Sequence, residues 1–180
     1  TASVRQQSQE GNYWDTFLST SFDYDKRNQR FQTDDGFRSL YSLDLPLISD
    51  TYTLTNSYNL QLYSSLYENN ISTFSLYLEN ANSLSGKDIK LTERLFVPSS
   101  KLRGFTRGKV GPNDGNDFVG GNYVSAINLT TTLPVLFENM DTFDASLFLD
   151  IANVWGVDYD SSIDDSNKIR SSIGIGFDWF

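Results

Sequence analysis

The chain has 180 residues, with 14 Lys and Arg against 23 Asp and Glu, and it contains neither Cys nor His. That length suits one ordinary domain or part of a larger one. The missing Cys and His exclude a Ser-His-Asp triad, a thiolate nucleophile, a disulfide framework and a His- or Cys-ligated zinc site. The formal charge of −9 and the pI near 4.3 argue against nucleic acid as a partner, which requires a surface rich in Lys and Arg.

The composition also limits the class of protein. Aromatic residues make up 14% of the chain, too many for an intrinsically disordered segment. No run approaches the roughly 20 apolar residues of a membrane-spanning helix, and the first residues lack the pattern of a signal peptide. Because the first residue is Thr1, we expect the chain to be a processed product or part of a longer protein.

Apolar and polar residues alternate with a period of two along most of the chain, which predicts β-strands, whereas helical spacing is not convincing anywhere. Clusters of Gly, Asn, Asp and Ser interrupt the alternation, as turns require. In chain order, the alternating segments are 14–24, 37–45, 54–66, 73–79, 143–151 and 169–179, with two less regular ones over Ile89–Val97 and Asn122–Thr132. The pattern therefore predicts an all-β, antiparallel protein of about eight strands.

Alternation alone fits either a soluble β-sandwich with one wet face or a transmembrane barrel. Three features favour the barrel: strands of roughly 9–12 residues, polar faces of Ser, Thr and Asn, and aromatic residues near strand ends, namely Trp14, Tyr24, Tyr67, Trp155 and Trp179. A charge facing lipid at mid-membrane costs about 2–4 kcal/mol. We therefore expect the isolated strand charges to point inward: Asp44, Glu79, Asp150, Arg170 and Asp178.

A short motif in the second half of the chain points to a family. The sequence Leu102-Arg103-Gly104-Phe105 resembles the (V/L)-R-G-(F/Y) signature of the BamA-type outer-membrane protein assembly factors, the bacterial surface antigen family. Further matches occur in family order: Asp25-Lys26-Arg27 followed by Phe31, Thr33 and Gly36, then Gly120-Gly121-Asn122, Leu133-Pro134, Phe148–Trp155 and Ser166–Trp179. The resemblance covers nearly everything from Trp14 to the end.

The resemblance implies an outer-membrane barrel of about sixteen antiparallel strands that follows a set of periplasmic domains. Residues 1–180 would then be a partial barrel of about eight middle-to-late strands, without the periplasmic domains and the terminal strands. Such a segment is not expected to close by itself, because open sheet edges in lipid leave backbone groups without partners. The implied location is the bacterial outer membrane.

The function that the resemblance implies is the folding and insertion of other β-barrel proteins, with no enzymatic reaction, no cofactor and no metal. The implied partners are unfolded outer-membrane protein clients, accessory lipoproteins of the assembly machinery and the lipid bilayer. Three alternatives stay open: a two-partner-secretion transporter of the same superfamily, a passive porin, and a soluble β-sandwich that binds a ligand.

In the family, the arginine of the signature lies at the tip of a long extracellular loop that folds back into the barrel and contacts acidic and aromatic side chains of the wall. Arg103 matches it here, and Asp150 matches the aspartate of the family's F-x-D-x-G strand motif, although Ala152 replaces its Gly. A guanidinium in a polar lumen favours a bidentate carboxylate, so we expect Asp150, with Phe148 on the same face, to receive Arg103. Gly104 would turn the loop tightly, and Phe105 would pack on the wall.

Two other features carry an expectation. Gly174 and Gly176 fall on the inward face of the last strand, where they permit close approach of another chain segment. Asp158, Asp160, Asp164 and Asp165 could bind calcium, but they lack the spacing and glycine of an EF-hand, and an exposed acidic loop is the favoured interpretation.

Overall fold

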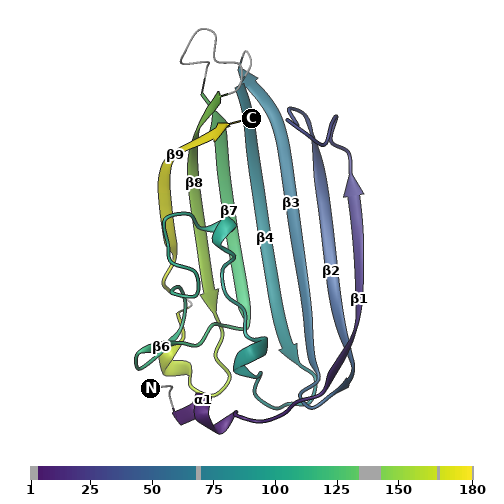
Figure 1. Ribbon diagram of the computed structural model, residues 1–180, viewed down its shortest axis with the longest axis vertical. Helices are drawn as coiled ribbons and strands as arrows, with labels where there is room; N and C mark the ends of the chain where they lie inside the picture. Colours follow the sequence, from purple (N-terminus) through teal and green to yellow (C-terminus); the bar gives the residue numbers. More distant parts are fainter. Residues whose placement is uncertain (1–3, 68–69, 134–142, 166, 180) are drawn as a thin grey trace.

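The computed structural model describes residues 4–67, 70–133, 143–165 and 167–179. Seven long strands form one antiparallel sheet in the order β1-β2-β3-β4-β7-β8-β9, so neighbours in sequence are neighbours in the sheet (Figure 1). The strands are β1 (Asp15–Asp25), β2 (Gly36–Ser49), β3 (Thr53–Tyr67), β4 (Asn70–Ser83), β7 (Tyr123–Thr132), β8 (Phe143–Trp155) and β9 (Arg170–Trp179). The prediction of an all-β, antiparallel architecture is confirmed, and β1 and β9 are the edges of the described sheet.

The remaining elements are short. Two strands of two residues each, β5 (Asn113–Asp114) and β6 (Asp117–Phe118), pair in a short hairpin. The described helices are α1 (Val4–Ser8) and three 3-10 turns, η1 (Leu91–Glu93), η2 (Ser99–Lys101) and η3 (Ser161–Ile163). Among the described residues, no helix has the length and apolar character needed to cross a membrane. Pro134 of the expected Leu133-Pro134 turn and Ser166 of the last matching segment lie outside the described residues.

The predicted strand over Ile89–Val97 is wrong. The segment contains η1 and forms one isolated bridge, between Leu95 and Gly121, which precedes β7 and lies outside the sheet. Its apolar Ile89 and its polar Lys90 and Arg94 are all buried, at 1%, 6% and 5% exposure. The alternation therefore does not separate a wet face from a dry face, because the segment lies between the sheet and other loops.

The register of the sheet places alternate side chains of each long strand on the same face. Asn128 of β7 pairs with Ser75 of β4 and with Asp150 of β8, and Asp150 pairs with Ser172 of β9. Counting along the strands from these pairs places all five isolated charges on one face, as predicted: Asp44, Glu79, Asp150, Arg170 and Asp178. The opposite face carries large exposed apolar side chains, such as Phe22, Leu129 and Ile173.

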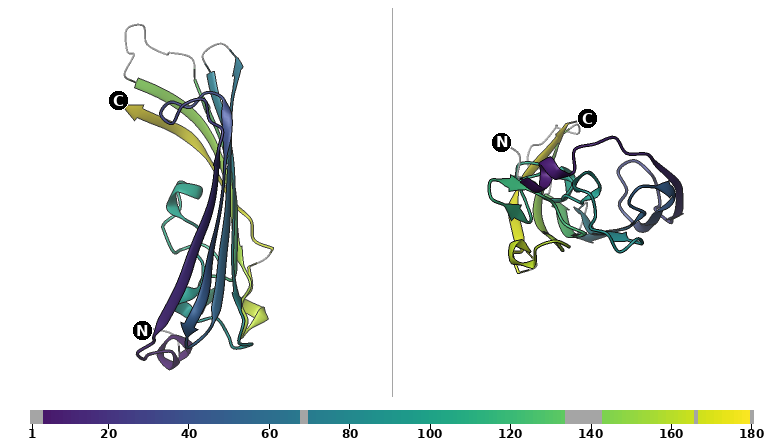
Figure 2. Two further views of the ribbon diagram at one scale, coloured as in Figure 1. Left: turned by 90° about the vertical axis from the view of Figure 1, so that its right-hand side faces the viewer. Right: turned by 90° about the horizontal axis from the view of Figure 1, so that it is seen from below.

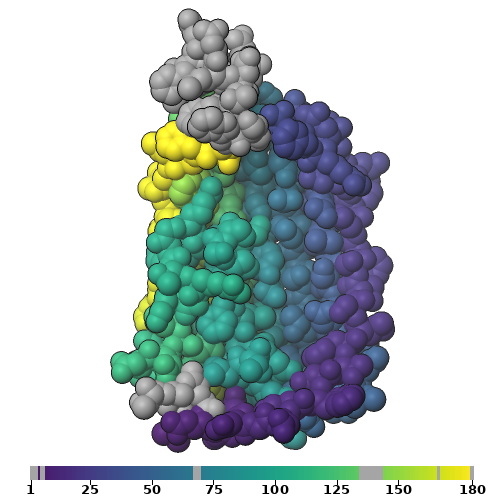
Figure 3. All heavy atoms as spheres, viewed as in Figure 1, coloured from purple at the N-terminus to yellow at the C-terminus, as the bar shows by residue number. Residues whose placement is uncertain are grey.

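The sheet curves, and the connection 84–122 lies on its concave side (Figure 2). In the space-filling view this connection covers the inner face of β7, β8 and β9 over their lower and middle parts, while more of the inner face of β2 to β4 remains visible (Figure 3). Barrels of the outer membrane have short periplasmic turns and longer extracellular loops. That rule assigns the end with 84–122 to the extracellular side and the end with the β3–β4 turn to the periplasmic side.

The assignment of the faces predicts the effect of a charge on each. Ile127 lies at the middle of β7 on the outward face, whereas Ser57 of β3 lies on the inner face opposite Glu79. We expect Ile127→Lys to lower the free energy of unfolding of the complete protein in lipid by about 2–4 kcal/mol, and Ser57→Lys, beside a carboxylate, by less than about 1 kcal/mol. Urea unfolding in phospholipid vesicles measures both, and equal losses would show that the outward face is not in lipid.

Candidate functional site

The tip of the connection 84–122 is held on the inner wall by an apolar side chain. Leu102 is only 2% exposed and belongs to the main cluster of buried apolar residues, with Val97, Val110, Val124, Ala126, Ala152 and Val154. The cluster joins the loop to β7 and β8, because small Val and Ala side chains on the inner faces of these strands leave room for Leu102. This packing places the next residue, Arg103, above the middle of β7 and β8.

Arg103 and Asp150 form the contact that the motif suggested. The Arg103 Nε donates to Asp150 Oδ2 at 2.8 Å and Nη2 donates to Oδ1 at 2.7 Å, which is the bidentate arrangement of a guanidinium and a carboxylate. The backbone N–H of Arg103 also donates to Asp150 Oδ2, at 3.0 Å. Asp150 is fully buried whereas the Arg103 side chain is 35% exposed, so the loop supplies the countercharge that the buried carboxylate requires.

An aromatic ring supports the guanidinium. The Arg103 Cζ lies 3.6 Å from the centre of the Phe148 ring, and Nη2 also reaches the hydroxyl of Thr130 at 3.3 Å. Gly174 of β9 pairs with Phe148, and a Cβ at Gly174 would come within 2.6 Å of that ring. The glycine therefore leaves the space that the ring occupies beneath Arg103.

Two residues of the site were missed by the sequence analysis, Asn128 and Lys101. The Asn128 side-chain amide donates both to the Lys101 carbonyl, at 2.8 Å, and to Asp150 Oδ1, at 2.9 Å, so it joins the loop backbone to the buried carboxylate. The Lys101 ammonium donates to Ser75 Oγ of β4 at 3.0 Å and lies 5.5 Å from the centre of the Tyr77 ring. Burial lowers the pKa of Lys101, and the nearby Asp150 opposes that shift.

The other motif residues are placed less tightly. Gly104 has a φ of 82°, in the left-handed region that favours glycine, and makes the turn expected of it. Phe105 differs from the expectation that it packs on the wall, because its side chain is 37% exposed and lines a small hollow with loop residues such as Val97 and Val110. A Cβ at Gly176 would approach only the hydroxyl of Ser146, so the packing depends less on a glycine at this position than at Gly174.

The base of the loop has a second set of polar contacts. Arg94, 5% exposed, reaches Asp158 Oδ2 at 3.4 Å and Asn122 Oδ1 at 3.3 Å, and the backbone N–H of Ile89 donates to Asp158 as well. Glu93 accepts hydrogen bonds from the hydroxyls of Thr51 and Thr53 at the β2–β3 turn. The loop is thus fixed both where it leaves the sheet and at its tip.

The acidic run after β8 is used by the chain itself. Asp165 is buried and pairs with Lys168 and Arg170, Asp164 accepts the Gly156 N–H, and Asp160 caps η3 through Ser162. The run is therefore only partly the exposed acidic loop that was expected. Within the part of the chain that the structure describes, no group of three or more Asp or Glu side chains is arranged to hold a metal ion.

A curved sheet with a charged inner face, an apolar outer face and a long loop folded onto its inner wall defines a segment of a transmembrane β-barrel. The sequence model of the Omp85 superfamily domain matches residues 1–180, and the chain therefore belongs to this superfamily. Proteins of this superfamily are β-barrels of the bacterial outer membrane, and that is the location of this chain.

Two individual proteins resemble the chain, one in sequence and one in fold. The chain is 29% identical over 107 residues to the outer membrane protein assembly factor BamA of Neorickettsia risticii, a match that covers 56% of this chain and 14% of the relative. Its fold resembles that of BamA from Haemophilus ducreyi lacking POTRA domains 1–3, with a TM-score of 0.79, 23% identity, and coverage of 91% of this chain and 36% of the other. The chain thus spans only a minor part of the length of either protein.

The close approach at Gly174 predicts a local effect of added volume. Gly174→Ala should displace the Phe148 ring and lower the free energy of unfolding by about 1–3 kcal/mol, the usual range for overpacking. Gly176→Ala is the matched control, because a Ser146 hydroxyl can rotate away from the new methyl group. Equal, small effects of both variants in urea unfolding of the complete protein would show that Gly174 does not fix the ring.

The buried pair predicts strong coupling between its partners. Arg103→Ala leaves the Asp150 carboxylate buried without its countercharge, so we expect it to lower the free energy of unfolding by about 3 kcal/mol. Asp150→Ala should lower it as well. The double variant should lose at least about 1 kcal/mol less than the sum of the two single losses. Fully additive losses in the complete protein would argue against a direct interaction.

Proposed function

We propose that this chain is the middle-to-late barrel segment of an outer-membrane protein assembly factor, which folds and inserts other β-barrel proteins. In such a factor a weakly paired sheet edge would accept incoming client strands through backbone hydrogen bonds. No covalent bond would be made or broken, so no enzymatic activity is part of the proposal. Unfolded barrel proteins would be the clients, and accessory lipoproteins would be the partners.

The observation that carries this proposal is the loop tip on the inner wall, with Arg103 paired to Asp150. This ion pair stabilises one position of the loop, because the fully buried Asp150 carboxylate would be a desolvated charge without Arg103. The similarity to an assembly factor in both sequence and fold supports the same conclusion. For this chain, the segment then acts mainly as scaffold and lumen wall, and the loop braces it.

The loop on the inner wall argues against a passive porin, and the similar proteins argue against a secretion transporter. A passive porin needs an open aqueous lumen, whereas here the connection 84–122 covers part of the inner wall (Figure 3). A two-partner-secretion transporter shares the superfamily but moves a polypeptide through the lumen. The relative and the solved structure described above are both assembly factors, which favours assembly over secretion.

The proposal is tested in a bacterium in which the complete gene replaces the resident one under depletion. Arg103→Ala should lower the amount of heat-modifiable, folded outer-membrane proteins several-fold, because the loop loses its fixed position. Arg107→Ala, which removes an exposed charge from the same loop, should leave that amount unchanged. If only the secretion of a single polypeptide falls while general barrel assembly continues, the chain is a transporter and the proposal is wrong.

A further inference from the structure

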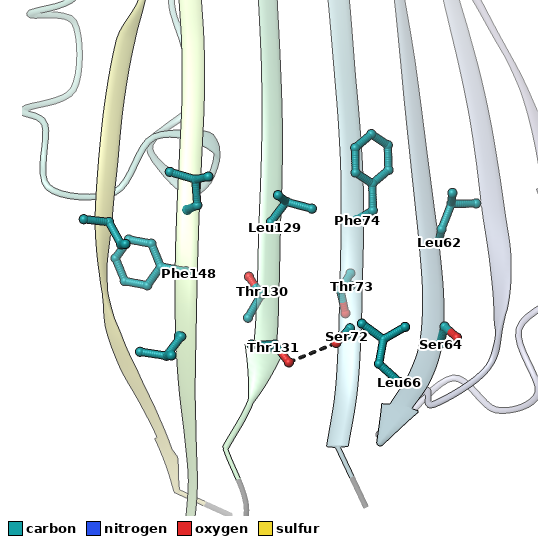
Figure 4. Close-up of a pocket in the computed structure, with 13 residues that line it drawn as sticks. Leu62, Ser64, Leu66, Ser72, Thr73, Phe74, Leu129, Thr130, Thr131 and Phe148 are labelled. Atoms are coloured by element: carbon teal, nitrogen blue, oxygen red, sulfur yellow. Dashed lines mark hydrogen bonds between the residues drawn. The ribbon is translucent and has the colours of Figure 1, made fainter. Parts of the chain in front are cut away.

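The outward face of the sheet contains a trough close to the β3–β4 turn. The cavity there has a volume of about 490 Å³ and extends over β3, β4, β7, β8 and β9. Figure 4 shows its lining residues, with Phe74 and Leu129 side by side on β4 and β7 and the Ser72–Thr131 hydrogen bond next to them. Small-molecule sites occupy roughly 300–1,000 Å³, so the trough is large enough for part of a ligand.

The trough results from two neighbouring rows of side chains that differ in size. The register aligns five large apolar residues across the sheet, Leu62, Phe74, Leu129, Leu149 and Ile173. One step closer to the β3–β4 turn, the next outward row has small residues on three of these strands, Ser64, Ser72 and Thr131. Leu66 and Leu147 bound the hollow on its other sides.

The neighbouring row in the opposite direction shows that the hollow is local. Outward positions of β3, β4, β7 and β8 in that row are again large and apolar: Leu60, Leu76, Ile127 and Ile151. Two consecutive rows of large residues give an even surface. The small row next to them therefore lowers the surface by the size of a side chain.

The floor of the trough is polar but largely saturated by its own hydrogen bonds. The hydroxyls of Ser72 and Thr131 lie 2.9 Å apart, and Thr131 donates to Asn70 Oδ1 at 2.8 Å. Asn70 in turn donates to the Thr132 carbonyl. Such a floor can contact methylene groups at little cost, and the exposed Ser64 hydroxyl at its edge can donate to an oxygen acceptor.

The surroundings of the trough determine what fills it. The outward face of an outer-membrane barrel contacts lipid, and the trough lies at the end that the loop lengths assign to the periplasmic side. We propose that the trough is a binding site for one phospholipid of the periplasmic leaflet. One acyl chain lies between the apolar row and Leu66, and an ester carbonyl accepts a hydrogen bond from Ser64. This lipid then dissociates more slowly than the lipids around the rest of the barrel.

Native mass spectrometry of the complete protein tests the proposal, with phosphatidylethanolamine as the added probe. The wild type should retain one lipid per barrel at detergent concentrations that remove the others. Ser72→Phe fills the trough from β4 and should weaken that binding roughly tenfold, the loss expected when about two methylene groups are no longer buried. Ser64→Phe fills it from β3 and gives an independent test if Ser72→Phe does not fold.

The matched control is Thr20→Phe, which adds the same ring to an exposed outward position of β1, outside the trough. This variant should retain the lipid as the wild type does, and all variants must show the heat-modifiable mobility of folded barrels. The proposal is overturned if the wild type retains no lipid beyond the level of Ser72→Phe, or if Thr20→Phe loses the lipid to the same degree. Retention of detergent alone in the trough would overturn it as well.

Discussion

The arrangement of this chain depends on a carboxylate that is buried in the wall of the sheet. Asp150 has no exposed surface, and an ionised carboxyl in such a place requires a countercharge and hydrogen bonds. Arg103 supplies both, with two side-chain donors and its backbone N–H, and Asn128 adds another donor. The apolar contacts of Leu102 hold the loop against the wall, whereas the ion pair and the neighbouring hydrogen bonds of Asn128 and Lys101 fix its position, because hydrophobic packing has no direction.

The same strand register determines the properties of both faces. Since successive side chains of a strand point to opposite sides, a shift of one residue in β8 would turn Asp150 toward lipid and Leu149 toward the loop. Neither could be tolerated, because the first would place a charge in the membrane and the second would leave Arg103 without its carboxylate. The ion pair on the inner face and the row of large apolar residues on the outer face therefore specify one register together.

Much of the fold could be predicted from the sequence because a period of two is visible along long strands. The inward position of Asp150 could be predicted for the same reason. Its pairing with Arg103 could be predicted because the motif resembles that of a family in which the arginine contacts the inner wall. The prediction over Ile89–Val97 was wrong because a buried loop segment can alternate without belonging to a sheet. The role of Asn128 could not be predicted from the sequence, since a single inward Asn does not reveal which carbonyl or carboxylate it contacts. The trough requires the relative register of five strands, which no local pattern contains.

The contacts of the loop are distributed unevenly over the sheet. Lys101 reaches Ser75 of β4, Arg103 reaches Asp150 of β8, and Arg94 reaches Asp158 beyond the end of β8. These attachments brace β4, β7 and β8. The loop reaches β1 and the β2–β3 turn at the lower end of the sheet, through the Lys90–Asp15 pair at 3.5 Å and the Thr51–Glu93 hydrogen bond, and the rest of β1 and β2 is held mainly by strand pairing. In the proposed assembly factor such a brace would keep the centre of this segment in one shape. Strands farther from the loop could change their pairing without releasing the loop from the wall.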